Sequence, residues 1–400
     1  MPPVLLRKAR EIVEESKYRP KFHFTAAKNW INDPNGLLWH DEKYHLYYQH
    51  NPFGTKWGHM SWGHATSEDL ISWTEHPVAI LEDESAGEAI FSGSAVYDET
   101  GTAGVANSIV ACYTAHTELG GQKRQYQAIA ISSDGGFTFE KQGPVLDVGK
   151  QDFRDPKVFR YNSAWYMVVA HPIEQQVEIL RSQNLREWHH LSYFQHLGPD
   201  DAIWECPDLF ELQADGEAKW VLIVSLNPGG PQNGSGTMYF IGEFDGVTFT
   251  KTQEPKWLDF GRDNYAGVTF NDAPNLERIL IGWMNSWGKT DHPELEWTGA
   301  MTVPRKLSLV SANSKWSLRQ DPVVAPQHVY TLNARNKYTE LLPHGIAANY
   351  NPESGQLIIA GYTAELPGMD QVVLEVLEDS CSVEIFANNR TVSFTFLVFN

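Results

Sequence analysis

The sequence predicts an all-β protein, a five-bladed β-propeller followed by a smaller and shortened C-terminal β module. Three observations support this prediction. Short apolar or alternating runs separated by turn residues recur from about residue 22 to residue 310, and no long helix-period segment interrupts them. A turn followed by an aromatic residue returns several times within this region. After residue 310 the pattern changes, and a proline-rich stretch precedes further strands.

Residues 1–20 are predicted to hold an N-terminal amphipathic helix. Apolar residues between Leu5 and Val13 recur at helical spacing, the charged residues lie largely on the other side, and Pro20 ends the segment. We expect this helix to lie against the main body of the protein.

Residues 21–310 are predicted to form the propeller. Strands are expected at residues 44–48, 61–65, 94–97, 109–114, 127–132, 157–161, 165–170, 177–182, 220–225, 238–243 and 278–285. The sequence Ser-Glu-Asp-Leu-Ile-Ser-Trp at 67–73 resembles Ser-Gln-Asn-Leu-Arg-Glu-Trp at 182–188, and looser versions occur at 133–139 and 244–249. Their spacing of roughly 50–65 residues suits one four-stranded blade per unit, so this region accommodates about five blades. A sandwich or a barrel would show similar strands but would not require the recurring turn.

Residues 311–326 are predicted to be a linker, because they contain the run Asp-Pro-Val-Val-Ala-Pro at 321–326. Residues 327–400 are predicted to form a second β module, with alternating strands at 356–360, 371–377 and 382–386. So short a module has little core of its own, and we expect it to pack against the propeller.

The composition excludes several classes of partner. Lys and Arg number 31 against 50 Asp and Glu, which gives a net charge of −19. Nucleic acids and anionic membranes attract basic surfaces, so neither is an expected partner. Aromatic residues make up 12% of the chain and include 14 Trp; they either fill the core or stack on sugar rings, and composition alone does not distinguish these uses.

The three cysteines form no motif, so neither a disulfide framework nor a zinc site is predicted. No apolar run is long enough for a membrane span, and the N-terminus has no long apolar segment typical of a signal peptide. We therefore expect a cytoplasmic protein. Secretion stays open if a signal peptide has been removed, and the glycosylation sequons at Asn233 and Asn389 are compatible with it.

Asp33 is the first candidate site residue. It lies in Asn-Trp-Ile-Asn-Asp-Pro-Asn-Gly at 29–36, where Pro34 disfavours a helical Asp33 and Gly36 permits a tight bend. We expect Asp33 at the end of an extended segment that enters a turn. An isolated stretch of this kind would more often be a plain Asx turn between strands.

Two further acids have similar surroundings. Asp155 also precedes a proline, which predicts an extended backbone, and Arg154 lies beside it; the alternative is a strand-edge turn with a surface ion pair. Glu205 lies between Trp204 and Cys206, and we expect these apolar neighbours to favour its protonated form, as a general acid requires. Inner strands of different blades start near the propeller axis, so the three acids could converge there. Two convergent carboxylates, one ionised and one protonated, are the groups that hydrolyse glycosides.

Several motifs resemble the signature blocks of glycoside hydrolase family 32, which comprises invertases, inulinases, levanases and related fructan-active enzymes. The main blocks lie at residues 30–36, 91–94, 154–156 and 205–208. Further similar blocks lie at 57–64, 67–73, 227–230, 265–268 and 282–285, so the resemblance covers residues 20–310 in the family's order. It implies a five-bladed propeller followed by a β-sandwich.

The resemblance also implies roles for individual residues. Asp33 matches the nucleophile, Asp155 the transition-state stabiliser and Glu205 the acid/base. The residues matching the pocket for the terminal fructose are Asn32, Gln49, Trp57, Phe91, Ser92, Arg154 and Trp283. No metal or organic cofactor is implied; His23, His50, His59 and His64 are expected to form structural hydrogen bonds. Cys206 is either a modulator of Glu205 or an ordinary buried thiol.

The resemblance implies a retaining β-fructofuranosidase that releases terminal fructose from sucrose and from inulin- or levan-type fructans through a covalent fructosyl-enzyme. One alternative is a fructosyltransferase that uses the same site with a sugar acceptor, and another is a non-catalytic fructan-binding homologue. The sandwich of the family is about twice as long as the segment after Pro322, so we expect an abridged sandwich. Its edges could be covered by a partner chain, and a homo-oligomer is a further expectation.

Overall fold

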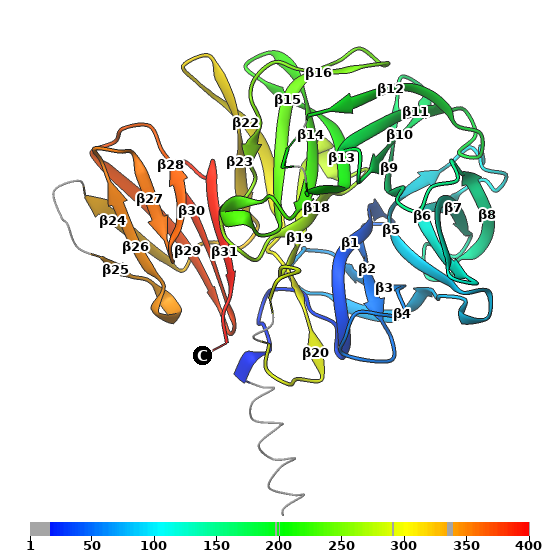
Figure 1. Cartoon of the computed structure of the whole chain (residues 1–400), viewed down its shortest axis with the longest axis horizontal. Coiled ribbons are helices and arrows are strands. Elements are labelled where there is room, and N and C mark those ends of the chain that lie inside the picture. The colour runs from blue at the N-terminus through cyan, green and yellow to red at the C-terminus, as the bar shows by residue number, and fades with distance from the viewer. Residues whose placement is uncertain (1–16, 197, 200, 290–291, 334–338, 400) are drawn as a thin grey trace, which may run out of the picture.

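The computed structural model describes residues 17–196, 198–199, 201–289, 292–333 and 339–399. Residues 1–16, which hold most of the predicted N-terminal helix, lie outside the described residues. No helix in the described ranges is long and apolar enough to cross a membrane. The strands of the described chain form seven sheets, five before residue 323 and two after it (Figure 1).

The five sheets are the blades of the propeller, and the predicted fold class is confirmed. Their strands are β1 (Asn29–His40), β2 (Lys43–Asn51), β3 (Ser61–Ser67) and β4 (Thr74–Ile80); β5 (Glu88–Asp98), β6 (Ser108–Leu119), β7 (Gln122–Ser132) and β8 (Glu140–Leu146); β9 (Arg154–Tyr161), β10 (Ala164–His171), β11 (Gln176–Ser182) and β12 (His189–Gln195); β13 (Ile203–Ala214), β14 (Glu217–Asn227), β15 (Gly236–Phe244), β16 (Phe249–Lys251) and β17 (Lys256–Trp257); and β18 (Tyr265–Thr269), β19 (Arg278–Met284), β21 (Ala300–Met301), β22 (Arg305–Ala312) and β23 (Lys315–Pro322). Short 3₁₀ helices lie at η1 (Glu84–Ala86), η2 (Pro231–Asn233) and η3 (Pro274–Leu276).

The first strands of the five sheets line the axis. They contact one another in a closed ring, β1 with β5, β5 with β9, β9 with β13, β13 with β18 and β18 with β1. Strand β20 (Trp297–Thr298), which follows the fifth blade's β19 in the chain, pairs in parallel with β1 and ties the last blade to the first. An apolar cluster fills each of the five interfaces between successive blades.

The inner strands share a local irregularity. In all five blades a register shift interrupts the pairing of the inner strand with its neighbour. Such bulges bend a strand and redirect its side chains. At four of them a residue has a left-handed backbone: φ is 54° at Gly36, 66° at Asp155, 48° at Cys206 and 54° at Ala266.

Two backbone predictions were therefore wrong. Residues 33–36 do not form a turn, because β1 continues through them as a bulged strand. Gly36 is needed there, since a Cβ at its position would lie 2.5 Å from Tyr47 Cδ2 and 2.9 Å from Trp62 Cζ3. Asp155 is not extended despite the proline that follows it, because the bulge of β9 outweighs the local preference of a residue before proline.

The predicted turn-plus-aromatic repeat is confirmed as the connection between the third and fourth strands of blades one to four. In the first blade, Ser67 Oγ donates to Asp69 Oδ1 at 3.0 Å, and that oxygen accepts the backbone N–H groups of Ile71 and Ser72 at 2.8 and 2.6 Å. Ser182 and Asn184 repeat this arrangement in the third blade. These are Asx turns, so the sequence repeat reflects the same tight turn between the third and fourth strands of successive blades.

The predicted linker at 311–326 needs correction. Strand β22 extends to Ala312, and β23 occupies Lys315–Pro322 as the outer strand of the fifth blade. Only residues 323–327 connect the last propeller strand to β24. Strand β23 is difficult to predict from sequence, because it contains Lys, Ser, Arg and Gln with few apolar residues and ends in Asp-Pro.

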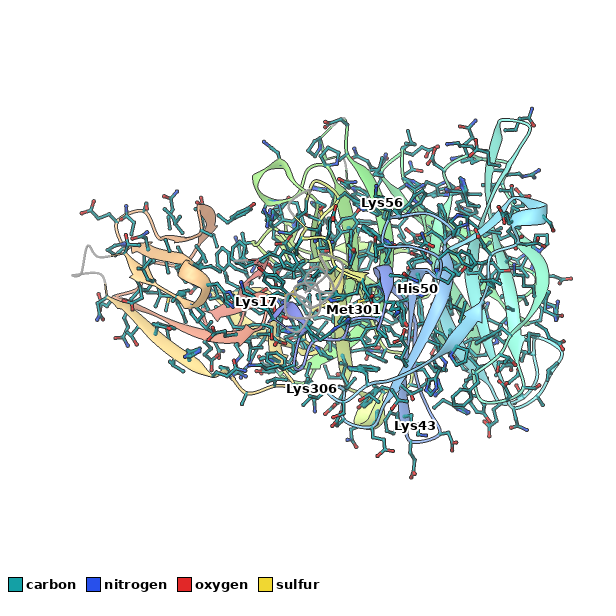
Figure 2. The ribbon with its side chains drawn as sticks, turned by 90° about the horizontal axis from the view of Figure 1, so that it is seen from below. Lys17, Lys43, His50, Lys56, Met301 and Lys306 are labelled. Carbon is teal, nitrogen blue, oxygen red and sulfur yellow. The ribbon has the colours of Figure 1, made fainter. Side chains whose placement is uncertain are left out.

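The C-terminal module consists of two four-stranded sheets with an apolar core between them. One sheet contains β24 (His328–Asn333), β29 (Gln371–Asp379), β30 (Ser382–Ala387) and β31 (Val392–Leu397), and the other contains β25 (Glu340–Leu341), β26 (Ala347–Asn351), β27 (Gln356–Ile359) and β28 (Tyr362–Glu365), with η4 (Pro343–Gly345) beside them. Viewed from below, this sandwich lies at one end of the molecule and the propeller at the other (Figure 2).

Buried charges join the two modules. Arg305 of the fifth blade donates to Glu384 of the sandwich at 2.5 Å and to Asp259 at 3.2 Å. His23 bonds Glu384 at 2.8 Å and Asp379 at 2.9 Å, so the N-terminal segment joins the same network. All five side chains are shielded from solvent or nearly so. The short module therefore packs closely against the propeller.

Candidate active site

A cavity of about 460 Å³ opens at the inner strands of the propeller, which is within the range of small-molecule sites. Residues from the first four blades and from the segment after β19 form its wall. They are Asn32, Asp33, Gln49, Trp57, Phe91, Ser92, His116, Lys123, Gln125, Gln151, Asp152, Arg154, Asp155, Glu205 and Trp287.

Asp33 is held by two polar donors. Ser92 Oγ donates to Asp33 Oδ2 at 2.7 Å and Asn32 Nδ2 donates to Oδ1 at 3.1 Å. The Asn32 amide is itself oriented by Trp30 Nε1, which donates to its oxygen at 2.7 Å. Burial and the negative charge of Glu205 raise the pKa of Asp33, and the two donors oppose this rise.

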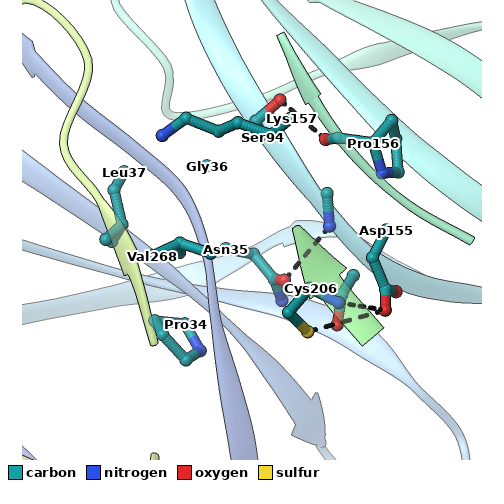
Figure 3. A pocket seen from close by; sticks show the side chains of 12 residues that line it. Pro34, Asn35, Gly36, Leu37, Ser94, Asp155, Pro156, Lys157, Cys206 and Val268 are labelled. Carbon is teal, nitrogen blue, oxygen red and sulfur yellow. Dashed lines mark hydrogen bonds between the residues drawn. The ribbon is translucent and has the colours of Figure 1, made fainter. Parts of the chain in front are cut away.

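Asp155 is the most enclosed of the three acids. Its Oδ2 atom accepts the backbone N–H of Cys206 at 2.9 Å, and the Cys206 thiol lies 3.5 Å from the same oxygen (Figure 3). The thiol also lies 3.6 Å from Asp33 Oδ2, so Cys206 bridges two of the acids. Burial and the charge of Glu205 raise the pKa of Asp155 to about 7, although the Arg154 cation opposes the shift.

Glu205 accepts a hydrogen bond at each of its two carboxyl oxygens. Arg154 Nε donates to Oε1 at 2.9 Å, and the Tyr265 hydroxyl donates to Oε2 at 2.5 Å. The expected apolar setting was wrong. Successive side chains of a strand point to opposite faces, so Trp204 enters the core while Glu205 faces the cavity between an arginine and a tyrosine.

Arg154 connects the acids to the second blade. Its side chain is 10% exposed, and its NH1 atom donates to Asp152 Oδ1 at 2.8 Å and to Gln125 Oε1 at 3.2 Å. Burial lowers the pKa of Arg154, but the negative charges around it, chiefly those of Glu205 and Asp155, together raise it by more, so the guanidinium stays charged. The guanidinium offsets part of the repulsion among three neighbouring carboxyl groups.

The structure brings together the three predicted acids and most of the other predicted residues. The ones that line the cavity are Asn32, Gln49, Trp57, Phe91, Ser92 and Arg154. Trp283 does not line it: the residue is fully buried and packs against Trp30 and Trp287, with ring centroids 5.8 and 5.0 Å away. Trp287, 37% exposed, occupies the wall instead.

Sequence reasoning missed Trp287, Tyr265, Gln125 and His116 as parts of the site. Tyr265 lies 60 residues from Glu205 in the chain, and its contact depends on how the fourth and fifth blades meet. Gln125 and His116 lie on a hairpin whose alternation alone does not reveal the face turned to the cavity. The resemblance block at 265–268 was the only sequence signal for Tyr265.

The four histidines singled out in the sequence all make hydrogen bonds. His50 Nδ1 bonds the carbonyl of Trp30 at 2.9 Å, and His59 Nδ1 bonds Glu82 at 2.6 Å. His64 lies 3.1 Å from His45, while His23 belongs to the network between the modules. No set of three or more His, Cys, Asp or Glu side chains suited to a metal ion occurs in the described residues.

Comparison with known proteins identifies relatives of this arrangement. Residues 23–322 match the family described as Glycosyl hydrolases family 32 N-terminal domain. The chain is 40% identical to a levanase of Bacillus subtilis (strain 168) over 361 residues, covering 86% of this chain and 52% of the levanase. It is 41% identical to an extracellular exo-inulinase of Aspergillus niger over 349 residues, covering 77% of this chain and 65% of that protein.

A crystal structure of an exo-inulinase from Aspergillus awamori superposes with a TM-score of 0.87 at 32% sequence identity. The superposition covers 96% of this chain and 93% of that one. The sequence matches, by contrast, span about half of the levanase and about two thirds of the Aspergillus niger exo-inulinase.

Proposed function

The chain belongs to glycoside hydrolase family 32, and we propose that it is a retaining β-fructofuranosidase that removes terminal fructose from sucrose and from inulin- or levan-type fructans. The observation that carries this proposal is the convergence of Asp33, Asp155 and Glu205 on one cavity. Two carboxyl groups in different protonation states are the chemistry that glycoside hydrolysis requires.

The proposed reaction needs one proton and one ionised nucleophile among the three neighbouring acids. Burial and mutual repulsion raise the pKa values of Asp33 and Asp155, so the group retains a proton near neutral pH. In the complex with substrate we assign that proton to Glu205. The hydroxyl of Tyr265 can accept a hydrogen bond from protonated Glu205 as readily as it donates to the ionised form. We assign Asp33 as the ionised nucleophile, and the hydrogen bonds that Ser92 and Asn32 donate favour this form against the burial that raises its pKa.

In the first step Glu205 transfers its proton to the glycosidic oxygen while a carboxylate oxygen of Asp33 attacks C2 of the fructosyl unit. The bond from C2 to the leaving oxygen breaks, and a fructosyl ester of Asp33 forms. Asp155 accepts hydrogen bonds from ring hydroxyl groups as positive charge develops at C2. Charge-assisted bonds of this kind strengthen in the transition state.

In the second step ionised Glu205 removes a proton from water, and the water oxygen attacks C2. The bond between C2 and Asp33 breaks, so fructose leaves with its β configuration retained and the enzyme returns to its starting state. The half-exposed ring of Trp57 and that of Trp287 flank the cavity and offer apolar faces to the sugar.

The proposed substrates follow from the relatives, which are by name a levanase and exo-inulinases. Incubation with sucrose, inulin and levan, followed by chromatography, is the direct test. Fructose as the sole early product from the polymers is expected. Mixed oligosaccharides would contradict the exo mode, and longer products built from sucrose would favour transfer over hydrolysis.

Two variants test the assigned roles. Asp33→Ala should remove activity on sucrose and on an activated aryl β-fructofuranoside. Glu205→Ala should lose about 10²- to 10⁴-fold on sucrose but much less on the aryl substrate, whose leaving group needs no proton. Azide should then yield a β-fructosyl azide with retained configuration. An inverted product, or an Asp33→Ala variant as active as the parent, would refute the mechanism.

For the compartment, we keep a cytoplasmic location as the proposal, whereas the exo-inulinase relatives are extracellular by name. Fractionation of source cells, with activity on sucrose followed in medium and lysate, decides between them. Activity mainly in the medium would overturn the cytoplasmic assignment.

A further inference from the structure

His116 lies on the cavity wall, and the mechanism above gives it no role. It is on β6, directly opposite Gln125 on β7 in the ladder of the second blade. Residues paired across two strands have their side chains on the same face, so the two groups interact directly.

The orientation of the Gln125 amide is determined by its neighbours. Gln125 Oε1 accepts the backbone N–H of Phe153 at 2.9 Å and Arg154 NH1 at 3.2 Å, and both groups can only donate. The amide nitrogen must therefore be the atom that faces His116, where it lies 3.2 Å from Nδ1. Because an amide nitrogen only donates, Nδ1 of His116 is the acceptor and the ring hydrogen is on Nε2.

The ring of His116 is also fixed in its plane. Phe91 stacks on it with 4.6 Å between ring centroids and 1° between the planes. Burial and the charge of Lys123 lower the pKa of His116, which keeps the ring neutral at neutral pH. The result is a rigid imidazole with one defined donor.

That donor is available to a ligand. Within the described part of the chain, Nε2 of His116 has no hydrogen-bond partner. The buried polar atoms without a partner do not include it, so this nitrogen is not buried. The residue is half-buried and borders the cavity. An N–H donor held in this way matches a sugar hydroxyl or ether oxygen.

The wall that holds His116 lies outward from the acids. Side-chain exposure rises from 10% at Arg154 to 40% at Asp152 and 55% at Lys123, which is close to His116 on the same hairpin. In the proposed function the fructosyl unit under attack binds at the enclosed floor beside Asp33, which places the next sugar along the more open wall. We propose that His116 Nε2–H donates a hydrogen bond to the leaving-group sugar and so determines which leaving groups are accepted; this inference rests on the proposed function.

The test compares two substrates within each protein. His116→Phe keeps the stacking on Phe91 but loses the donor, whereas His116→Gln keeps an N–H group near the position of Nε2. The specificity ratio is kcat/KM for sucrose divided by kcat/KM for p-nitrophenyl β-fructofuranoside, whose leaving group has no sugar hydroxyls. We expect His116→Phe to lower this ratio about five- to tenfold, mainly through a higher KM for sucrose, and His116→Gln to lower it less. His189→Phe, at an exposed position of β12, is the matched control and should leave the ratio unchanged.

The ratio is internal to each preparation, so partial unfolding lowers both rates and leaves it unaltered. An unchanged ratio in His116→Phe, or an equal fall in the His189 control, would overturn the role of His116 while the proposed function stands. A parent protein that releases fructose from neither substrate would instead overturn the proposed function, and the role of His116 with it.

Discussion

Ser92 offers a sharp test of how the site controls its nucleophile. Its hydroxyl donates to Asp33 Oδ2 at 2.7 Å and lowers the pKa that burial and Glu205 raise. Ser92→Ala removes a hydrogen bond to a charged group, a loss of about 1.5–3 kcal/mol in the stability of ionised Asp33. The pKa of Asp33 should therefore rise, and attack on C2 requires the ionised form.

The expected result is pH-dependent. At acidic pH, kcat/KM for sucrose should fall about 10- to 100-fold, because each 1.4 kcal/mol is a factor of ten, and the deficit should shrink as the pH rises. A pH–rate profile from pH 3.5 to 8 measures this. The acid limb should move to higher pH.

Ser94 provides the matched control. It lies two residues away on β5 and is equally buried, but its hydroxyl donates to the carbonyl of Pro156 and accepts the N–H of Val158. Ser94→Ala should lower stability and leave the acid limb in place. The reasoning would be refuted if the acid limb of the pH–rate profile stayed in place in Ser92→Ala, or if it moved to higher pH by the same amount in Ser94→Ala.

Three further predictions concern hydrogen bonds and buried charge. Tyr265→Phe should lower kcat/KM for sucrose about tenfold and affect the aryl fructoside less, because it loses a bond to the acid/base carboxylate; steady-state rates check this. Burial, aided by neighbouring histidines, lowers the pKa of His45 to about 4 and that of His64 to about 2, both below the unfolded value of 6.5. Their stabilisation is present above pH 6.5 and is lost as the pH falls, by about 1.4 kcal/mol per pH unit for each histidine. Urea unfolding at pH 7 and pH 5 measures the slope, which His64→Gln should flatten; an unchanged slope would contradict the assignment. Arg305→Met should destabilise the protein by about 3–5 kcal/mol, since it leaves buried carboxylates unpaired, whereas partly exposed Arg319→Met should change it by less than about 1 kcal/mol in the same assay.

Much of the fold was predictable because it is encoded in local patterns. The strands at 44–48 and 165–170 alternate or run apolar as the blades require, and the Asx turn at 67–73 repeats because each blade needs the same connection. Strand β23 was missed, since its burial depends on the neighbouring blade and its own composition is polar.

The site was predictable only in part. Asp33, Asp155 and Glu205 lie in motifs with chemical meaning, but the rules for residues before proline describe a free chain, and the bulge of β9 overrides them at Asp155. The positions of Trp283 and Tyr265 depend on packing between blades, which no short stretch of sequence records.

The bulged inner strands have a consequence for how this scaffold can change. A left-handed backbone at a non-glycine residue costs about 1–3 kcal/mol, and Asp155 and Cys206 both adopt one beside the cavity. The free energy of unfolding of the propeller is thus lower because of the backbone conformation that positions its acids, so activity is obtained at a cost in stability. A substitution at Asp155 or Cys206 therefore changes folding stability and the surroundings of the reacting groups together.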